Sequence, residues 1–166
     1  MAKIIWITGI SGTGKSTFAK LFQKKTHGYV WIDGDKFRKL FNNDLGYSLK
    51  DRDKNAMRLI NFVNFLANQK FNVLVSANLT SEKYKKLIRK KFKRLSLIHL
   101  VTDIKILKKR DKKDIYTKKK NVVGLDIKDK KSFNKYDYKI INNSKKKDFL
   151  KKVEIFINGQ YKNKSF

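Results

Sequence analysis

Apolar residues in this chain fall into short continuous runs, which alternate with longer segments where they recur at helical spacing. The short runs predict strands at 3–8, 29–32, 72–76, 95–101 and 138–141. The helical spacing predicts helices at 15–26, 36–41, 51–69, 82–93, 103–109 and 145–157. Ser48 and Asp51 have capping-box spacing at the start of the long helix, and Thr80 or Ser81 is a candidate cap for the helix after it.

This alternation predicts an α/β fold, with a five-stranded parallel sheet, right-handed crossovers and helices on both faces. Ligands bind such sheets at the carboxyl ends of the strands, so we expect functional residues in the loops that follow them. Residues 112–135 have poor periodicity and dense charge, which favours a mobile loop. The sequence has no internal repeat and no linker, so we expect residues 1–166 to form one domain.

The first predicted strand is followed at 9–16 by Gly-Ile-Ser-Gly-Thr-Gly-Lys-Ser, which matches the phosphate-binding pattern G-x-x-x-x-G-K-[ST] in full. Glycines let the main chain approach a phosphate, and amides at the start of a helix bind its oxygens. Lys15 would reach the β- and γ-phosphates of ATP, and the Ser16 hydroxyl would bind Mg²⁺. The expected ATP-binding residues of this segment are Gly9, Ser11, Gly12, Thr13, Gly14, Lys15, Ser16 and Thr17.

The phosphate pattern alone does not separate a kinase from an ATPase or a GTPase. Directly after the second predicted strand, Asp33 and Asp35 place two carboxylates at the same edge of the sheet. Such a pair suits the organisation of Mg²⁺ and the activation of an acceptor hydroxyl. An ordinary turn would also account for Asp-Gly-Asp, so this motif is a weaker signal than the phosphate loop.

Three stretches around these carboxylates resemble the adenylylsulfate (APS) kinase family. They are Asp-Gly-Asp-Lys-Phe-Arg at 33–38, Asp-Leu-Gly-Tyr-Ser at 44–48 and Asp-Arg-Asp-Lys-Asn-Ala-Met-Arg at 51–58, with weaker matches at 110–116 and 124–126. The resemblance implies a P-loop NTPase-type three-layer fold and phosphorylation of the ribose 3′-hydroxyl of a nucleotide by ATP. It also implies a homodimer and a lid, which we expect at about 112–135.

The resemblance further implies roles for individual residues. Asp35 would be the catalytic carboxylate, acting with Lys15 and with Mg²⁺ bound by Ser16 and Asp35, and Arg110 would contact ATP. The acceptor-binding residues would be Asp33, Arg38, Tyr47, Arg52, Asn55, Lys113 and Val122, with the arginines at the anionic end of the acceptor and Tyr47 against its base. The residue types also allow Arg38 to be a solvated helix arginine, Tyr47 a packed core residue and Arg58 an ion-pair partner.

Four departures from the family pattern concern the acceptor. Lys36 replaces an Asn, residues 78–80 replace Ile-Ser-Pro, the lid is shorter, and Val122 stands where the family has a Phe that covers the adenine. A stacked base contributes about 1–3 kcal/mol, so the preference for adenine should weaken. The departures favour cytidine diphosphoramidate, the acceptor of kinases that resemble this family and serve capsule decoration, over APS, which stays the alternative.

The net charge of +28 and the pI near 10.2 would suit a nucleic acid, an anionic membrane or another polyanion as partner. However, the chain is rich in Lys, Asn, Ile and Phe and has no Pro, a composition that AT-rich codons produce, so we expect most lysines on a solvated surface. A kinase or binder of nucleic-acid ends, using the basic stretch at 83–94, is one rival hypothesis. A P-loop module without catalysis is another, although the retention of Asp33 and Asp35 argues against it.

Other features narrow the setting. The chain has no Cys, so neither a disulfide nor a thiolate metal site can form. The chain opens without a signal-peptide pattern, and its first apolar run is too short to span a membrane, so we expect a cytoplasmic protein. His27 and His99 have no potential ligands clustered around them, so we expect structural roles for both and no metal other than Mg²⁺.

Overall fold

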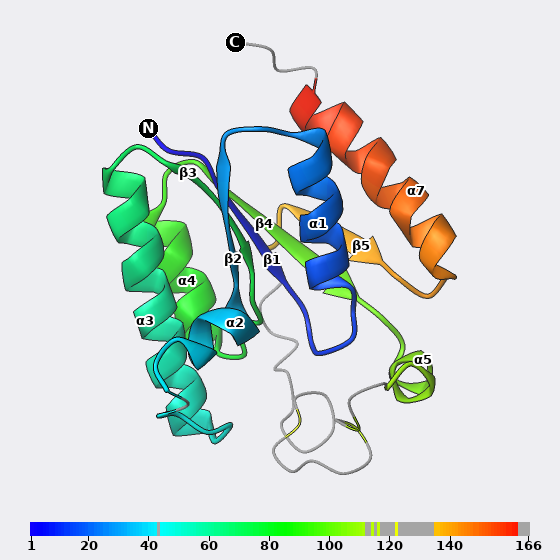
Figure 1. Ribbon diagram of the computed structural model, residues 1–166, viewed down its shortest axis with the longest axis horizontal. Helices are drawn as coiled ribbons and strands as arrows, with labels where there is room; N and C mark the ends of the chain where they lie inside the picture. The colour runs from blue at the N-terminus through cyan, green and yellow to red at the C-terminus, as the bar shows by residue number, and fades with distance from the viewer. Residues whose placement is uncertain (43, 112–113, 115, 117–121, 123–134, 163–166) are drawn as a thin grey trace.

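The computed structural model describes residues 1–166 except 43, 112–113, 115, 117–121, 123–134 and 163–166. Its centre is a parallel sheet of five strands, β1 (Ile4–Thr8), β2 (Tyr29–Asp33), β3 (Asn72–Ser76), β4 (Leu95–Val101) and β5 (Tyr138–Ile141). The strand order is β2-β3-β1-β4-β5, so β1 is central and β2 and β5 form the edges. All strands run in the same direction, so their carboxyl ends meet at one edge of the sheet (Figure 1).

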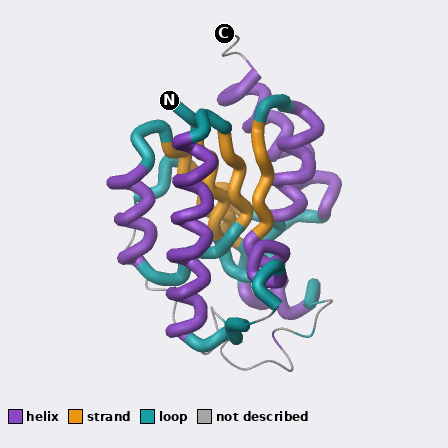
Figure 2. Tube along the Cα trace, turned by 60° about the vertical axis from the view of Figure 1, so that its left-hand side comes forward, coloured by secondary structure: helices purple, strands orange, loops and turns teal. Residues whose placement is uncertain are grey.

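Helices cover both faces of the sheet (Figure 1). Helices α1 (Lys15–Lys25) and α7 (Lys146–Ile157) pack side by side on one face, and α3 (Leu49–Asn68) and α4 (Glu82–Lys91) lie on the other. Figure 2 shows the sheet between these two helical layers. The short helices α2 (Gly34–Lys39) and α5 (Ile104–Lys109) follow β2 and β4 at the carboxyl edge, and a π-helical turn, η1 (Asn158–Lys162), extends α7.

An apolar core lies on each face of the sheet. Trp6 of β1 is fully buried towards α3 and α4, where Val63 packs in the same core. Its neighbour Ile5 points to the opposite face, where it joins Phe18 of α1 and Phe149 of α7. Because both faces are covered, β1 has no solvent-facing side, and its sequence is a continuous apolar run rather than an alternating one.

The structure confirms the α/β architecture predicted from the sequence. Each strand agrees with its predicted range to within one residue, and each helix to within two. The largest shift is in α2, which begins at Gly34 because the Asp33 side chain caps it, accepting from the backbone N–H groups of Asp35 and Lys36. Ser48 caps α3 as predicted, whereas Ser81 precedes α4 without a side-chain capping bond.

Two further expectations concern the described residues. His99 of β4 stacks on Tyr136 with ring centroids 4.3 Å apart, as expected for a packed strand residue. In the predicted lid at 112–135, only Asp114, Tyr116, Val122 and Lys135 belong to the part of the chain that the structure describes. Across the described residues, no helix combines the length and apolarity needed to cross a membrane.

Candidate active site

The phosphate loop joins β1 to α1 at the carboxyl edge of the sheet, and its glycines are required by close packing. Gly9 has φ 147°, and a Cβ there would lie 2.4 Å from the backbone oxygen of Leu100 in β4. Gly14 has φ 100°, and a Cβ there would lie 2.9 Å from both Asn142 and Phe149. Positive φ and the missing side chain together let the loop lie directly against β4 and the start of α7.

The ammonium group of Lys15 lies within this loop. Its Nζ donates to the backbone oxygens of Gly9 at 2.8 Å and Ile10 at 2.9 Å. The hydroxyl of the buried Thr13 also donates to the Ile10 oxygen, at 2.9 Å. A positive charge is thereby held at the start of α1, where helix amides already favour an anion.

A second element braces the loop from the segment between β5 and α7. The Nδ2 of Asn142, which is 5% exposed, donates to the backbone oxygen of Thr13 at 2.9 Å. Arg110 donates in turn to the backbone oxygens of Asn142, at 3.1 Å, and Ser144. The structure therefore places Arg110 beside the phosphate loop, and its contact with ATP stays a prediction. Sequence reasoning missed Asn142, whose only signal is a polar residue just after an apolar strand.

The base of the predicted lid contacts the same loop. The Tyr116 hydroxyl donates to the backbone oxygen of Ser11 at 2.6 Å, and burial, followed by the nearby Asp111 carboxylate, raises the pKa of Tyr116 to about 12. Tyr116 packs with Val122 and Leu107 in a small apolar cluster. Val122 is thus buried against the lid base, and its predicted position over the acceptor base stays a prediction. Lys113 lies outside the described residues.

Asp33 is the carboxylate that lies next to the phosphate loop. The Ser16 hydroxyl donates to its Oδ2 at 2.7 Å, and the Ser76 hydroxyl donates to the same oxygen at 3.1 Å. Ser76 is itself held by Trp31, whose Nε1 donates to its hydroxyl at 3.0 Å. Partial burial raises the pKa of Asp33, but the hydrogen bonds from Ser16, the α2 amides and Ser76 outweigh burial and lower it below its usual range.

These oxygen atoms fit a magnesium ion. Mg²⁺ is usually held by one or two carboxylates together with substrate phosphates and water. Ser16 and Asp33 supply a hydroxyl and an ionised carboxylate at one point beside the phosphate loop. The family resemblance implies Asp35 as the partner of Ser16, so Asp33 joins the candidate metal ligands and the role of Asp35 there stays a prediction. Among the described residues no three His, Cys, Asp or Glu side chains cluster as a metal site.

Asp35 lies in the first turn of α2, two residues beyond Asp33, and its side chain is exposed. Its carboxylate is close enough to Arg52 to favour the charged guanidinium, although burial and then the nearby Arg38 lower the pKa of Arg52 overall. Asp35 is thus close in the chain to the Ser16–Asp33 pair, and its charge acts on Arg52. Its role as the catalytic carboxylate stays a prediction.

Two arginines and one tyrosine form a platform before and at the start of α3. The Tyr47 ring contacts two guanidinium groups, that of Arg38 at 4.9 Å from the ring centroid and that of Arg52 at 5.4 Å. Arg38 is 8% exposed and donates to the Gly46 backbone oxygen, while Arg52 donates through Nε to the Tyr47 oxygen at 3.0 Å. Arg38 is therefore not a solvated helix arginine, and Tyr47, 49% exposed, is not a core residue. We call Arg38, Tyr47 and Arg52 the arginine–tyrosine platform.

Two α3 residues near the platform differ in what they contact. Asn55, one turn after Arg52, is 8% exposed, and its Oδ1 is buried with no hydrogen-bond partner among the described residues. A buried oxygen without a partner costs free energy unless a ligand or water satisfies it, which suits the predicted acceptor role. Arg58, by contrast, donates to both carboxylate oxygens of Asp44, at 2.8 and 2.6 Å, so it is the ion-pair partner that the sequence allowed.

Comparisons with known proteins agree with this geometry. Residues 1–131 match the family model of adenylylsulphate kinase. The chain is 32% identical over 164 residues to cytidine diphosphoramidate kinase of Campylobacter jejuni, covering 93% of this chain and 94% of that protein. It is 34% identical over 122 residues to adenylyl-sulfate kinase of a Shewanella species, covering 69% of this chain and 59% of that protein.

A solved structure extends the likeness to three dimensions. The APS kinase of Mycobacterium tuberculosis, in complex with AMPPNP and APS, aligns with a TM-score of 0.79 and 26% identity. The alignment covers 95% of this chain and 96% of that one. The P-loop kinase fold expected from the sequence is thereby confirmed.

Proposed function

The chain belongs to the adenylylsulphate kinase family, and on this premise we propose that it transfers the γ-phosphoryl group of ATP to the ribose 3′-hydroxyl of cytidine diphosphoramidate. The observation that carries the proposal is the Ser16–Asp33 pair beside the phosphate loop, with Asp35 two residues farther on and its charge acting on Arg52 of the arginine–tyrosine platform. A phosphoryl donor on one side and an anionic nucleotide on the other would meet at the Asp35 carboxylate.

The donor side works through fixed charges. The amides of the phosphate loop and the start of α1 bind the phosphate oxygens, and Lys15 neutralises charge on the β- and γ-phosphates. Ser16 and Asp33 would hold Mg²⁺, which when bound stabilises the negative charge that develops on the transferred group. Tyr116 and Asn142 hold the loop in place by donating hydrogen bonds to its backbone oxygens.

The acceptor side positions the nucleophile. Arg38 and Arg52 bind the anionic, pyrophosphate-like end of the acceptor, and the Tyr47 ring stacks on its base. Asn55 would donate or accept one further hydrogen bond. Asp35 accepts the proton of the 3′-hydroxyl as the oxygen attacks the γ-phosphorus, and the bond from that phosphorus to the β–γ bridging oxygen breaks. Products are ADP and the 3′-phosphorylated nucleotide.

Two observations favour a cytidine acceptor over an adenine one. The relative named cytidine diphosphoramidate kinase matches nearly the whole of both chains, whereas the adenylyl-sulfate kinase match covers 69% of this chain. In addition, Val122 is aliphatic, so the acceptor base would have Tyr47 as its aromatic partner and nothing aromatic at that position of the lid base. A pyrimidine ring loses less by this than a purine ring, because it offers less surface for stacking.

Steady-state kinetics with both acceptors test the assignment. We expect a higher kcat/KM for cytidine diphosphoramidate than for APS, measured by coupled ADP release at a fixed saturating ATP concentration. A higher kcat/KM for APS would overturn the assignment and make APS the acceptor. Product analysis by ³¹P NMR should show phosphorylation of the ribose 3′-oxygen, and phosphorylation elsewhere would contradict the proposed site geometry.

The basic charge raises the nucleic-acid alternative, which the same protein can test. A binder of nucleic-acid ends should hold a short single strand tightly, with a steep dependence on salt. We expect weak and sequence-independent binding at physiological salt, consistent with general attraction by a chain of net charge +28. We also retain a homodimer and a cytoplasmic location as parts of the proposal, the latter because ATP is supplied there; sedimentation equilibrium checks the former.

A further inference from the structure

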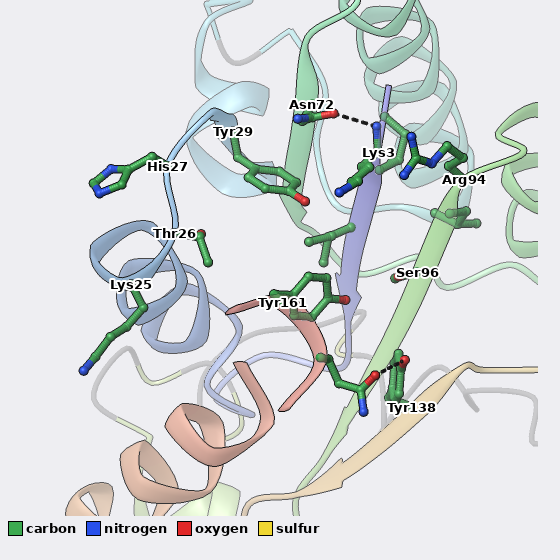
Figure 3. Close-up of a pocket in the computed structure, with 14 residues that line it drawn as sticks. Lys3, Lys25, Thr26, His27, Tyr29, Asn72, Arg94, Ser96, Tyr138 and Tyr161 are labelled. Atoms are coloured by element: carbon green, nitrogen blue, oxygen red, sulfur yellow. Dashed lines mark hydrogen bonds between the residues drawn. The ribbon is translucent and has the colours of Figure 1, made fainter. Parts of the chain in front are cut away.

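A cavity of about 480 Å³ opens at the end of the sheet away from the phosphate loop (Figure 3). The first residue of every strand contributes to its wall: Ile4, Tyr29, Asn72, Leu95 and Tyr138. The end of α1 and the turn η1 complete it. The phosphate loop begins after the last residue of β1, so one five-residue strand, about 15 Å, separates the two sites.

The charge of the cavity is one-sided. Its wall contains Lys3, Lys25, His27 and Arg94, and no Asp or Glu is found among the 14 described residues that line it. Lys25 contributes least, because it is paired with Glu154 and its side chain points away from the centre (Figure 3). The cavity therefore favours an anion, whose negative charge would be bound mainly by Arg94 and Lys3.

Arg94 and Asn72, which both line the cavity, mark where the anionic group would lie. One Nη of Arg94 donates to the Met1 backbone oxygen at 3.2 Å, which fixes the guanidinium at the rim. Asn72 is fixed as well, since its Oδ1 accepts from the Lys3 backbone N–H at 2.8 Å. These groups form a fixed set of donors for phosphate oxygens.

The opposite wall is aromatic and rigid. Tyr29 and Tyr161 each pack edge-to-face on the buried Phe22, both with ring centroids 5.2 Å apart. Tyr138 is held by its hydroxyl, which donates to Gln160 Oε1 at 2.9 Å. Figure 3 shows Tyr29 and Tyr161 on the same side of the opening, facing Lys3 and Ser96. Flat apolar surface beside fixed cationic donors suits a flat ring that carries an anionic group, and the volume is that of a small-molecule site.

We propose that this amino-edge cavity is a second binding site, which takes a phosphate monoester attached to a flat ring and can be filled while ATP occupies the phosphate loop. The site does not depend on which acceptor the kinase uses. General attraction between anions and lysines would not produce such a site, because exposed lysines such as Lys93 lack both the enclosure of the cavity and its aromatic wall.

The direct test is an NMR titration of the ¹⁵N-labelled protein with phenyl phosphate, in the presence of saturating AMPPNP and Mg²⁺. We expect saturable, one-to-one shifts of the backbone amides of Tyr29, Asn72 and Ser96. Phenol, which lacks the anion, and inorganic phosphate, which lacks the ring, should each bind at least about tenfold more weakly. Shifts confined to the phosphate loop and the arginine–tyrosine platform, or no shifts at all, would overturn the proposal.

Matched variants locate the anion subsite. Arg94→Gln should weaken phenyl phosphate binding by about tenfold or more, because a charge-assisted hydrogen bond is lost. Lys93→Gln removes the same charge one residue earlier, outside the cavity, and should leave the affinity unchanged. Lys3→Gln provides a second variant inside the cavity and should also weaken binding, with the ¹⁵N spectrum reporting that each variant is folded. Equal affinity in Arg94→Gln and Lys93→Gln would show that only net charge matters and would refute the assignment.

Discussion

The donor and acceptor sides of the candidate active site are built from different kinds of atoms. On the donor side, the loop is shaped by positive-φ glycines and held by its own backbone oxygens, which accept from Lys15, Tyr116 and Asn142. On the acceptor side, the arginine–tyrosine platform consists of three side chains, in which both guanidinium groups contact the Tyr47 ring. Under the proposed function, main-chain amides together with Lys15 would bind the donor, whereas side chains alone would bind the acceptor.

This difference teaches where the site can change. Thr13 in the phosphate loop is fully buried, whereas Tyr47 on the platform is 49% exposed. Altering the donor would require a new backbone path packed against β4 and α7, since even one added Cβ at Gly9 meets the Leu100 oxygen. Altering the acceptor would require the exchange of platform side chains, of which Tyr47 is 49% and Arg38 8% exposed.

The largest expected effect on kcat is at Asp35, the proposed proton acceptor. Asp35→Asn should lower kcat by about 10²–10⁴-fold, because the acceptor hydroxyl loses its proton acceptor. The affinity for ATP should be unchanged, since the phosphate loop does not use Asp35. Stopped-assay kinetics and calorimetric ATP binding measure the two quantities separately.

A matched control for this change is Asp148→Asn, which removes an exposed carboxylate from the first turn of α7. It should leave both kcat and ATP binding as they are. Turnover that survives in Asp35→Asn would show that another group accepts the proton, and Asp33 would be the first to examine.

The next largest effect separates acceptor binding from donor binding. Arg52→Gln should raise the KM for the acceptor by about 10- to 100-fold, the value of one hydrogen bond between charged groups, while the KM for ATP stays the same. Lys54→Gln removes the same charge from an exposed position two residues along α3 and should change neither constant. An equal rise in both KM values would mean that the platform does not belong to the acceptor alone.

The mirror-image test is made on the donor side. Tyr116→Phe removes the hydrogen bond to the Ser11 oxygen and should raise the KM for ATP by about three- to tenfold, with the acceptor KM unchanged. Tyr138→Phe loses a comparable bond, to Gln160 at the opposite end of the sheet, and serves as the control. A rise in the KM for the acceptor alone would show that Tyr116 acts on acceptor binding and contradict its assignment to the donor side.

The sequence predicted the fold and the phosphate loop well, because both depend on local patterns. Strands buried on both faces are continuous apolar runs, and the loop needs glycine at fixed spacing. The braces of the loop could not be predicted in this way. Asn142 meets Thr13 across 129 positions and Tyr116 meets Ser11 across 105, so both contacts depend on the order of the strands and on where the lid base packs.

The choice between neighbouring carboxylates also lay beyond the sequence. Asp33 and Asp35 are two residues apart in one motif, and either could accompany Ser16. In the structure Asp33 does so: its Oδ1 accepts from the first amides of α2, and its Oδ2 accepts from Ser16 and Ser76. Similarly, Val122 was predicted from a family position, but its packing with Leu107 and Tyr116 could be seen only in the folded chain.

The smallest expected effect on activity is at Arg58, and it tests whether acceptor binding is confined to the arginine–tyrosine platform. Arg58→Gln breaks the exposed ion pair with Asp44 and should change kcat and both KM values by less than about twofold. A small fall in Tm is expected at neutral pH. The hydrogen bond from Arg58 lowers the pKa of Asp44, so this stabilisation is present above the unfolded-state pKa and is lost as the pH falls through the lowered value. The difference in Tm between Arg58→Gln and the unmodified protein should therefore disappear at acidic pH. A large rise in the KM for the acceptor would instead show that Arg58 belongs to the acceptor-binding platform.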